Sequence, residues 1–275
     1  MGSLTDKAEQ SLLDHLFNAA YSSVATVYVG LCTADPTDAA TGAACNEVPN
    51  AFNYARTAIT FGAAATRKVT QNALVTFPTA SGAWGTASHW VILDNNTYGA
   101  GNALAHGAFS VPKAIVNGNT PSIASGQVYV EFSANEIGTV VVHKLLDRMF
   151  RNQAYAKPDT YVALVITTPV VDADTGSTIV EPGTGSYARK QVNINGGASP
   201  TWDLATGTTP TYVDNTHDIT FVTATADWGT IIAVAICSAL TAGDVLMYDN
   251  DMADQAVSSG DTAKFLASQL VAQMS

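Results

Sequence analysis

Leu12-Leu13-Asp14-His15-Leu16-Phe17 returns as Leu145-Leu146-Asp147-Arg148-Met149-Phe150, 133 positions further along the chain. The same spacing relates Tyr28-Val29-Gly30-Leu31 to Tyr161-Val162-Ala163-Leu164, and Tyr54-Ala55-Arg56 to Tyr187-Ala188-Arg189. The spacing then widens to 144, at which Trp84-Gly85-Thr86 matches Trp228-Gly229-Thr230. A repeat of this length has the size of a domain, not of a solenoid unit. The sequence therefore predicts two tandem copies of one domain, residues 1–137 and 138–275, with an insertion of about 11 residues within 195–217.

Each copy opens with a helical pattern. Leu12, Leu13, Leu16 and Phe17 form one apolar stripe, and Ser3 with Asp6 has the spacing of a capping box, so we expect a helix over about 4–21. The stripe recurs at 145–150, where the preceding Val140–Val142 fits either the first helical turn or the end of a strand.

Short β-rich segments separated by turn residues follow each helix. This pattern is typical of an antiparallel β-sandwich or jelly-roll-like domain, so the predicted fold is mainly β, with one short amphipathic helix before each domain. For the tail at 263–271 we favour a strand over a helix. The predicted strands are 26–32, 54–61, 73–77, 89–94, 102–109 and 126–133, and then 160–167, 187–194, 217–223, 231–237, 244–249 and 262–266.

The composition fits two ordered, acidic domains. Hydrophobic residues make up 47% of the chain and charged residues 13%, which allows two sizeable cores. The net charge of −11 argues against direct binding of nucleic acid, which requires Lys and Arg against phosphates. We also expect neither a signal peptide nor a membrane span, because no basic start precedes an apolar stretch and no run of 18 apolar residues occurs.

The cysteines are Cys32, Cys45 and Cys237. We expect free thiols in a protein that folds in a reducing cytoplasm, and Cys237 lies in an apolar run. A disulfide between Cys32 and Cys45 is the alternative.

The residues that both copies share are those that the fold is most expected to need. Tyr54 and Arg56, like Tyr187 and Arg189, fall on one face of a strand, where the arginine can bridge to Glu47 or Glu181. A partner contact is the alternative. Trp84-Gly85-Thr86 and its repeat predict a sheet corner, with carbohydrate stacking as the alternative. Trp90 and Trp202 are not shared, so we expect them to be freer to serve an interface.

No pattern indicates catalysis, a cofactor or a metal. The histidines, at positions 15, 89, 106, 143 and 217, lack metal-ligand spacing. Asp249, Asp251 and Asp254 resemble part of a calcium loop but lack its glycine and distal glutamate. Asp35 and Asp38 have the residue types of an acid/base pair, yet Pro36 and the turn context explain them adequately. We therefore expect no enzyme.

Several blocks of the first copy together resemble a tailed-phage virion module. They are Tyr28-Val29-Gly30-Leu31, Thr33-Ala34-Asp35-Pro36-Thr37-Asp38, Tyr54-Ala55-Arg56-Thr57-Ala58-Ile59-Thr60-Phe61, Val75-Thr76-Phe77-Pro78 and Gly82-Ala83-Trp84-Gly85-Thr86. Proteins with this module are described as tail-fibre-like, minor capsid or head decoration (cement) proteins. The second copy departs from the pattern, with Phe221-Val222 in place of the Phe-Pro pair.

The resemblance implies a virion structural protein without catalytic residues. Because the chain has no heptads and no fibrous repeat, we expect a capsid decoration protein that binds the major capsid protein on the outer head surface and self-associates, as a trimer. The alternative is a tail-fibre or baseplate protein that binds a host receptor or glycan.

Overall fold

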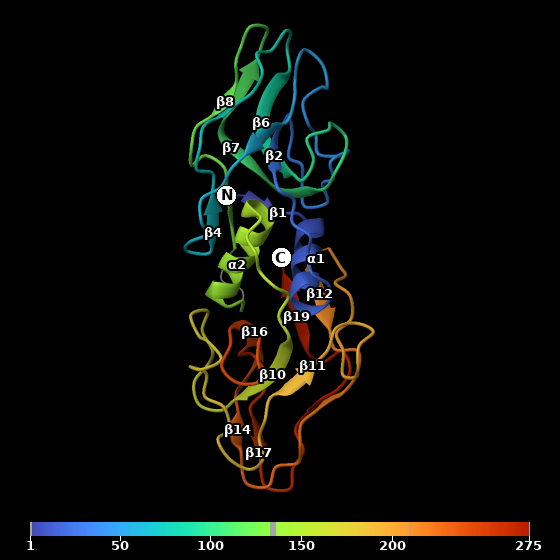
Figure 1. The fold of residues 1–275 in the computed structure, drawn as a ribbon, viewed down its shortest axis with the longest axis vertical. Coiled ribbons are helices and arrows are strands. Elements are labelled where there is room, and N and C mark those ends of the chain that lie inside the picture. Colours follow the sequence, from blue (N-terminus) through green and yellow to red (C-terminus); the bar gives the residue numbers. More distant parts are fainter. Residues whose placement is uncertain (1, 133–135, 209, 275) are drawn as a thin grey trace.

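The computed structural model describes residues 2–132, 136–208 and 210–274. It is elongated, with a β-rich domain at each end and both helices between them (Figure 1). The first copy contains β1 (Gly2–Leu4), α1 (Asp6–Phe17), β2 (Val27–Cys32), β3 (Thr57–Ile59), β4 (Lys68–Thr70), β5 (Val75–Thr76), β6 (Gly85–Leu93), β7 (Ala103–Ile115), β8 (Ser122–Ile123) and β9 (Tyr129–Glu131). The second contains α2 (Thr139–Arg151), β10 (Thr160–Val165), β11 (Lys190–Val192), β12 (Thr211–Asp214), β13 (Ile219–Thr220), β14 (Gly229–Ile231), β15 (Ala233–Cys237), β16 (Val245–Asp249), β17 (Gln255–Val257), β18 (Lys264–Phe265) and β19 (Val271–Met274). The protein is thus mainly β, with two tandem homologous domains, each preceded by a short helix.

The two copies share a four-stranded arrangement. The strand order β3-β2-β6-β7 in the first copy corresponds to β11-β10-β15-β16 in the second. The register also agrees, because Leu31 pairs with Trp90 and its repeat Leu164 pairs with Val234. In the first copy β1 pairs with both β7 and β9 and so extends the sheet to seven strands. Within the described residues of the second copy, β19 pairs with β12 alone.

Helix α1 begins after Thr5. The Thr5 backbone is extended, and its Oγ1 accepts a hydrogen bond from the Ala8 N–H. The predicted capping box is wrong, because Ser3 lies in β1 and pairs with His106. The helix ends before residue 21 because Asn18 leaves the helical conformation and its side-chain amide donates to the Asp203 carbonyl. In the second copy, Val140–Val142 forms part of the first turns of α2.

Each helix packs against the domain of the other copy. Helix α1 contacts β12 and β19 of the second copy in addition to β7 of its own copy, whereas α2 contacts β4 of the first copy (Figure 1). Asp14 accepts the backbone N–H of Ala205 at 2.9 Å, and its repeat Asp147 accepts that of Ala64 at 2.8 Å. The same hydrogen bond thus occurs twice, each time between one copy's helix and the other copy's domain.

Aromatic contacts repeat this exchange. The Phe17 ring packs on Trp202 with 4.9 Å between centroids, and its repeat Phe150 packs on Phe61 at 5.3 Å. Phe61 and Trp202 occupy equivalent positions, because they form matching bridges with Gln71 and Asn215. A single buried cluster runs through both copies, so the two domains share one continuous core.

Trp90 and Trp202 belong to this core, with 2% and 0% of their surface exposed. The prediction that they are free for an external interface is wrong. Trp202 instead anchors the insertion of the second copy on α1, and Trp90 lies against Gly2 of β1.

Several strands are shorter than predicted. Tyr54 and Arg56 precede β3, and Tyr187 and Arg189 precede β11, because their side chains bind loops instead of lying on a sheet face. The tail forms strands, as favoured, in β18 and β19, and the insertion contributes β12, which the sequence pattern did not predict. The end of the predicted strand 126–133 lies outside the described residues. Within the described part of the chain, no helix combines the length and apolar character needed to cross a membrane.

Candidate functional site

Arg56 and Arg189 each hold three loop segments together. Arg56 Nε and Nη2 bind the Glu47 carboxylate at 2.9–3.1 Å, Nη2 donates to the Gly42 carbonyl, and Nη1 donates to the carbonyls of Asn95, Thr97 and Ala100. Arg189 repeats this pattern on Glu181, Gly176, Ala239 and Ala242. Both arginines are 6% exposed. The predicted structural ion pairs are therefore confirmed, and burial leaves the guanidinium groups no free surface for a partner.

The shared tyrosines and tryptophans complete this arrangement. Tyr54 Oη donates to Glu47 and accepts the Leu31 N–H, and Tyr187 does the same with Glu181 and Leu164. Trp84 is 1% exposed and its indole N–H donates to the Phe52 carbonyl, while Gly85 has a φ of +96°. The predicted sheet corner is confirmed, and a buried indole cannot stack on a sugar.

Asp35 and Asp38 meet at one histidine. His106 Nδ1 lies 3.1 Å from Asp35 Oδ1, and His106 Nε2 lies 2.9 Å from Asp38 Oδ1. The Asp38 carbonyl also accepts the Asp6 N–H at the start of α1. The imidazole thus joins the 35–38 loop to β7, which gives both carboxylates a structural role.

Two further histidines and the cysteines have structural surroundings. His15 Nδ1 accepts the Tyr21 N–H, and His143 Nε2 accepts the Arg67 N–H. Burial, followed by the charges of Arg148 and Lys157, lowers the pKa of His15 to about 4. The three cysteines are free and buried, as expected.

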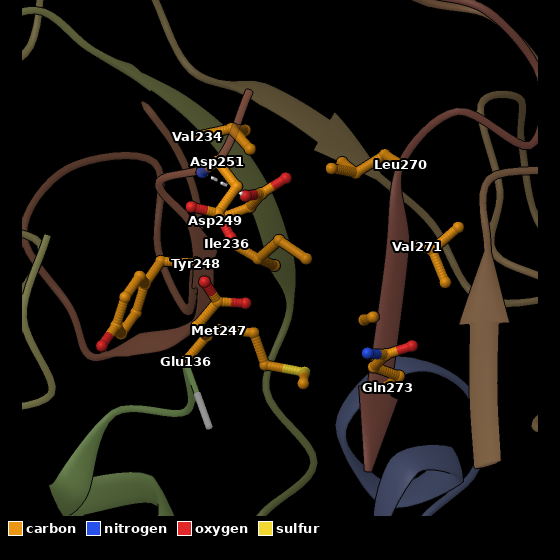
Figure 2. Close-up of a pocket in the computed structure, with 11 residues that line it drawn as sticks. Glu136, Val234, Ile236, Met247, Tyr248, Asp249, Asp251, Leu270, Val271 and Gln273 are labelled. Carbon is orange, nitrogen blue, oxygen red and sulfur yellow. Dashed lines mark hydrogen bonds between the residues drawn. The ribbon is translucent and has the colours of Figure 1, made fainter. Parts of the chain in front are cut away.

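One open cleft lies in the second copy, between β16 and β19 (Figure 2). We call it the second-copy cleft. Its volume is about 340 Å³. Val234, Ile236 and Met247 are buried and lie on one side of the cleft, and residues 270–273 lie on the other. The full lining is Glu136, Val234, Ile236, Met247, Tyr248, Asp249, Asp251, Leu270, Val271, Ala272 and Gln273.

Three carboxylates gather at one side of this cleft. One oxygen from each of Glu136, Asp249 and Asp251 lies within 4.8 Å of the other two, and Glu136 and Asp251 are exposed. Partial burial, followed by Asp249 and Asp251, raises the pKa of Glu136. The Asp251 N–H donates to Asp249 Oδ1 at 2.7 Å, which fixes the turn after β16 (Figure 2).

Carboxylate oxygens in this number attract a hard cation or an organic cation. Within the described ranges, this is the one group of His, Cys, Asp or Glu side chains with the spacing to hold a metal ion. Two of its members, Asp249 and Asp251, belong to the calcium-like segment of the sequence, whereas Asp254 stays outside. Glu136 is not part of that segment and could not be predicted from it, because it comes from the junction between the copies. Its backbone carbonyl accepts a hydrogen bond from the Tyr248 N–H, which holds it at the cleft.

Among the described residues that line the cleft, no nucleophile lies beside a base. The geometry provides a recess with an acidic rim in the second copy, which suits binding. The sequence blocks that the two copies share form contacts within the domains. None of their residues lines this recess, which lies in the second copy.

Comparison with known proteins identifies the family of this chain. Among curated protein sequences, none matches this chain. A family described as "Podophage GP4 fiber I protein gp80" matches residues 3–131 and again residues 136–273. The description names a fibre, so it fits the tail-fibre alternative at least as well as capsid decoration, which stays a prediction. The two matches cover both copies almost completely, and the chain therefore belongs to the podophage GP4 fiber I protein gp80 family, as a phage virion structural protein built by tandem duplication.

Proposed function

We propose that this protein is a structural segment of a podophage fibre, in which it acts as a stiff spacer with a β-domain at each end. The supporting observation is the reciprocal packing of α1 and α2, each on the other copy's domain. A flexible linker would let the two domains move separately, whereas exchanged helices and a continuous core oppose bending.

In this role the protein acts by contact and not by catalysis. Its net charge of −11 disfavours adsorption to anionic surfaces, which suits a part displayed outside the particle. Fibres are built from several copies, so we propose that the chain self-associates, as a trimer, and that a neighbouring virion protein anchors it. We also propose that the fibre binds a host receptor or glycan at the end that points away from the virion.

Labelling of intact virions tests the location. Gold-labelled antibodies raised against the purified protein are applied to phage particles and imaged by negative-stain electron microscopy. We expect gold on the tail appendages. Gold spread at regular lattice positions over the head would contradict the fibre proposal. Particles from a phage that lacks the gene provide the control for unspecific label.

Capsid decoration is the second candidate. One observation favours it: within the described residues the longest helix has 13 residues, so no coiled-coil stalk is present. Under this proposal the partner is the major capsid protein on the outer head surface, and the label would fall on the head.

A further inference from the structure

Cys32 and Cys45 come from two different segments of the first copy that pair with each other. Cys32 ends β2 and forms a bridge with Glu47. One residue further along, the Thr33 N–H donates to the Asn46 carbonyl at 2.9 Å. The chain that follows Cys45 therefore runs antiparallel to the end of β2, which brings the two cysteines to one place in the fold.

The Glu47 side chain shows that both thiols lie on the same side of the sheet. A Cβ on Gly30 would lie 2.8 Å from Glu47 Oε1, so the carboxylate covers the face of β2 that Gly30 shares with Cys32. Cys45 Sγ lies 3.9 Å from Glu47 Oε2. Both cysteines accordingly belong to one small apolar cluster, together with Ala40, Val91, Leu93 and Ala103.

The second copy has apolar side chains at the two equivalent positions. Val165 takes the place of Cys32 and Ile179 that of Cys45, because the backbone hydrogen bond between the two segments repeats at 3.0 Å. Ile179 packs against the cluster that contains Val165. Cys237 is the one cysteine among the described members of that cluster. The contact is thus part of the fold, whereas the pair of thiols is particular to the first copy.

Cys45 is the thiol of the pair that a small reagent can reach. A cavity of about 260 Å³ is lined by Cys45 together with Glu47 and Tyr98, whereas Cys32 is 0% exposed. A hydrogen bond from the Cys32 thiol lowers the pKa of Cys45, against the raising effects of burial and of Glu47. Because the thiolate is the nucleophile, we expect Cys45 to react first and Cys32 second.

We propose that Cys32 and Cys45 form a disulfide when the virion meets an oxidising medium, and that this bond fastens the loop before Glu47 to β2. The Cys45 thiolate attacks one sulfur of a small disulfide and releases a thiol. The Cys32 thiolate then attacks Cys45 Sγ and releases the second thiol, so each cysteine gives up one proton and one electron. The bond forms in a fibre and in a head protein alike, so its failure and that of the proposed function are distinguishable.

Hydroxyethyl disulfide is the probe, because it is a small disulfide that leaves a recognisable adduct. The native protein is incubated with it and unfolded, the remaining thiols are alkylated, and unreduced peptides are analysed by mass spectrometry. We expect a Cys32–Cys45 cross-link that lacks the mass of two hydrogen atoms, with Cys237 recovered as an alkylated thiol. An adduct that stays on Cys45 beside an alkylated Cys32 would contradict the proposal, as would two unmodified thiols or a link to Cys237.

Single variants test the order of attack. In Cys32→Ala, Cys45 should keep the hydroxyethyl adduct, because no second thiol displaces it. In Cys45→Ser, Cys32 should stay unmodified, because it is fully buried. The reverse pattern would overturn the assignment of Cys45 as the attacking thiol. If either variant does not fold, the cross-link in the natural protein decides alone.

Thermal unfolding tests whether the bond fastens the loop. The cross-link should raise the Tm of the natural protein by roughly 5–10 °C, the scale for closing a short loop. Reduction with dithiothreitol should reverse this gain, and Cys45→Ser treated in the same way is the control without it. An unchanged or lower Tm of the cross-linked protein would contradict the proposal.

Purified virions show whether the bond forms in the particle. Particles are collected in medium without a reductant, unfolded with an alkylating reagent present and digested. We expect the same Cys32–Cys45 cross-link. Full alkylation of both cysteines would contradict the proposal, wherever on the virion the protein lies.

Discussion

Arg56 and Arg189 show how much of each domain depends on one side chain. A single guanidinium neutralises Glu47 or Glu181 and also satisfies the carbonyls of several loop residues. Lysine cannot replace this planar set of donors, because its ammonium group offers three hydrogens from one point.

We therefore predict that Arg56→Lys lowers the free energy of unfolding by about 3–5 kcal/mol, the range for breaking a buried ion pair. Urea denaturation followed by circular dichroism measures the change. Arg151→Lys is the matched control, because Arg151 pairs with Asp147 on the surface of α2 and such pairs are worth about 0.3–0.5 kcal/mol. Equal losses in the two variants would contradict the structural role of Arg56.

Glu9 is a buried acid at the contact between the copies. It is 7% exposed and accepts a hydrogen bond from Thr211 Oγ1 at 3.2 Å. Burial, followed by the charges of Asp38 and Asp6, raises the pKa of Glu9 to about 7, against the lowering effect of Thr211. Between the ordinary pKa of a glutamate and about 7, the folded protein holds more protons at Glu9 than the unfolded chain does. This group therefore reduces stability as the pH rises through that window.

We predict that Glu9→Gln is more stable than the natural protein at pH 8 and close to it at pH 5. The expected gain in Tm at pH 8 is roughly 2–4 °C, which corresponds to about 1 kcal/mol in a chain of this size. Thermal unfolding at both pH values measures it. Asp254→Asn removes the same charge from the surface, and a similar gain in that variant would contradict the specific effect of Glu9.

For single residues, the sequence predicted the structural role of those that both copies share. Tyr54, Arg56 and Glu47 recur with nearly the same spacing, so their common role was visible. Glu136 was not, because it joins Asp249 and Asp251 only through the fold. The burial of Trp202 was not predicted, because its equivalent in the first copy is Phe61. A search for identical residues in the two copies does not reveal this match.

The helices illustrate what a sequence pattern predicts for an element and what it cannot. The apolar stripes of α1 and α2 indicated helices, but a stripe does not say which sheet it covers. Because both copies share the same strand order, packing of a helix on its own copy and packing on the other copy look alike in the sequence. Asn18, which bonds to Asp203 and Asn195, fixes the exchanged choice at the end of α1.

We predict that Phe17→Ala in the first copy loosens the second. Removing this ring should cost about 3–5 kcal/mol, as for other buried phenylalanines. Hydrogen exchange should accelerate most in β12 and β19, against which α1 packs. The matched variant Phe150→Ala should accelerate exchange in β4 and β9 instead. Faster exchange confined to each helix's own copy would refute the exchange.

The whole molecule behaves as one unit if its core is continuous. Trp84 and Trp90 report on the first copy, and Trp202 and Trp228 report on the second. We predict a single cooperative urea transition, at the same midpoint by tryptophan fluorescence of either pair and by circular dichroism. Variants with Trp→Phe in one copy separate the two signals. Two midpoints would mean that the domains unfold independently, as tandem repeats joined by a linker would.

The most direct measurement is a nuclear Overhauser experiment on selectively labelled phenylalanine and tryptophan. Phe17 and Trp202 have ring centroids 4.9 Å apart, and Phe61 and Phe150 are 5.3 Å apart, so we expect cross-peaks for both pairs. Packing of each helix on its own domain would instead give cross-peaks from Phe17 to Phe61 and from Phe150 to Trp202. The first pattern supports a stiff two-domain spacer, and the second contradicts it.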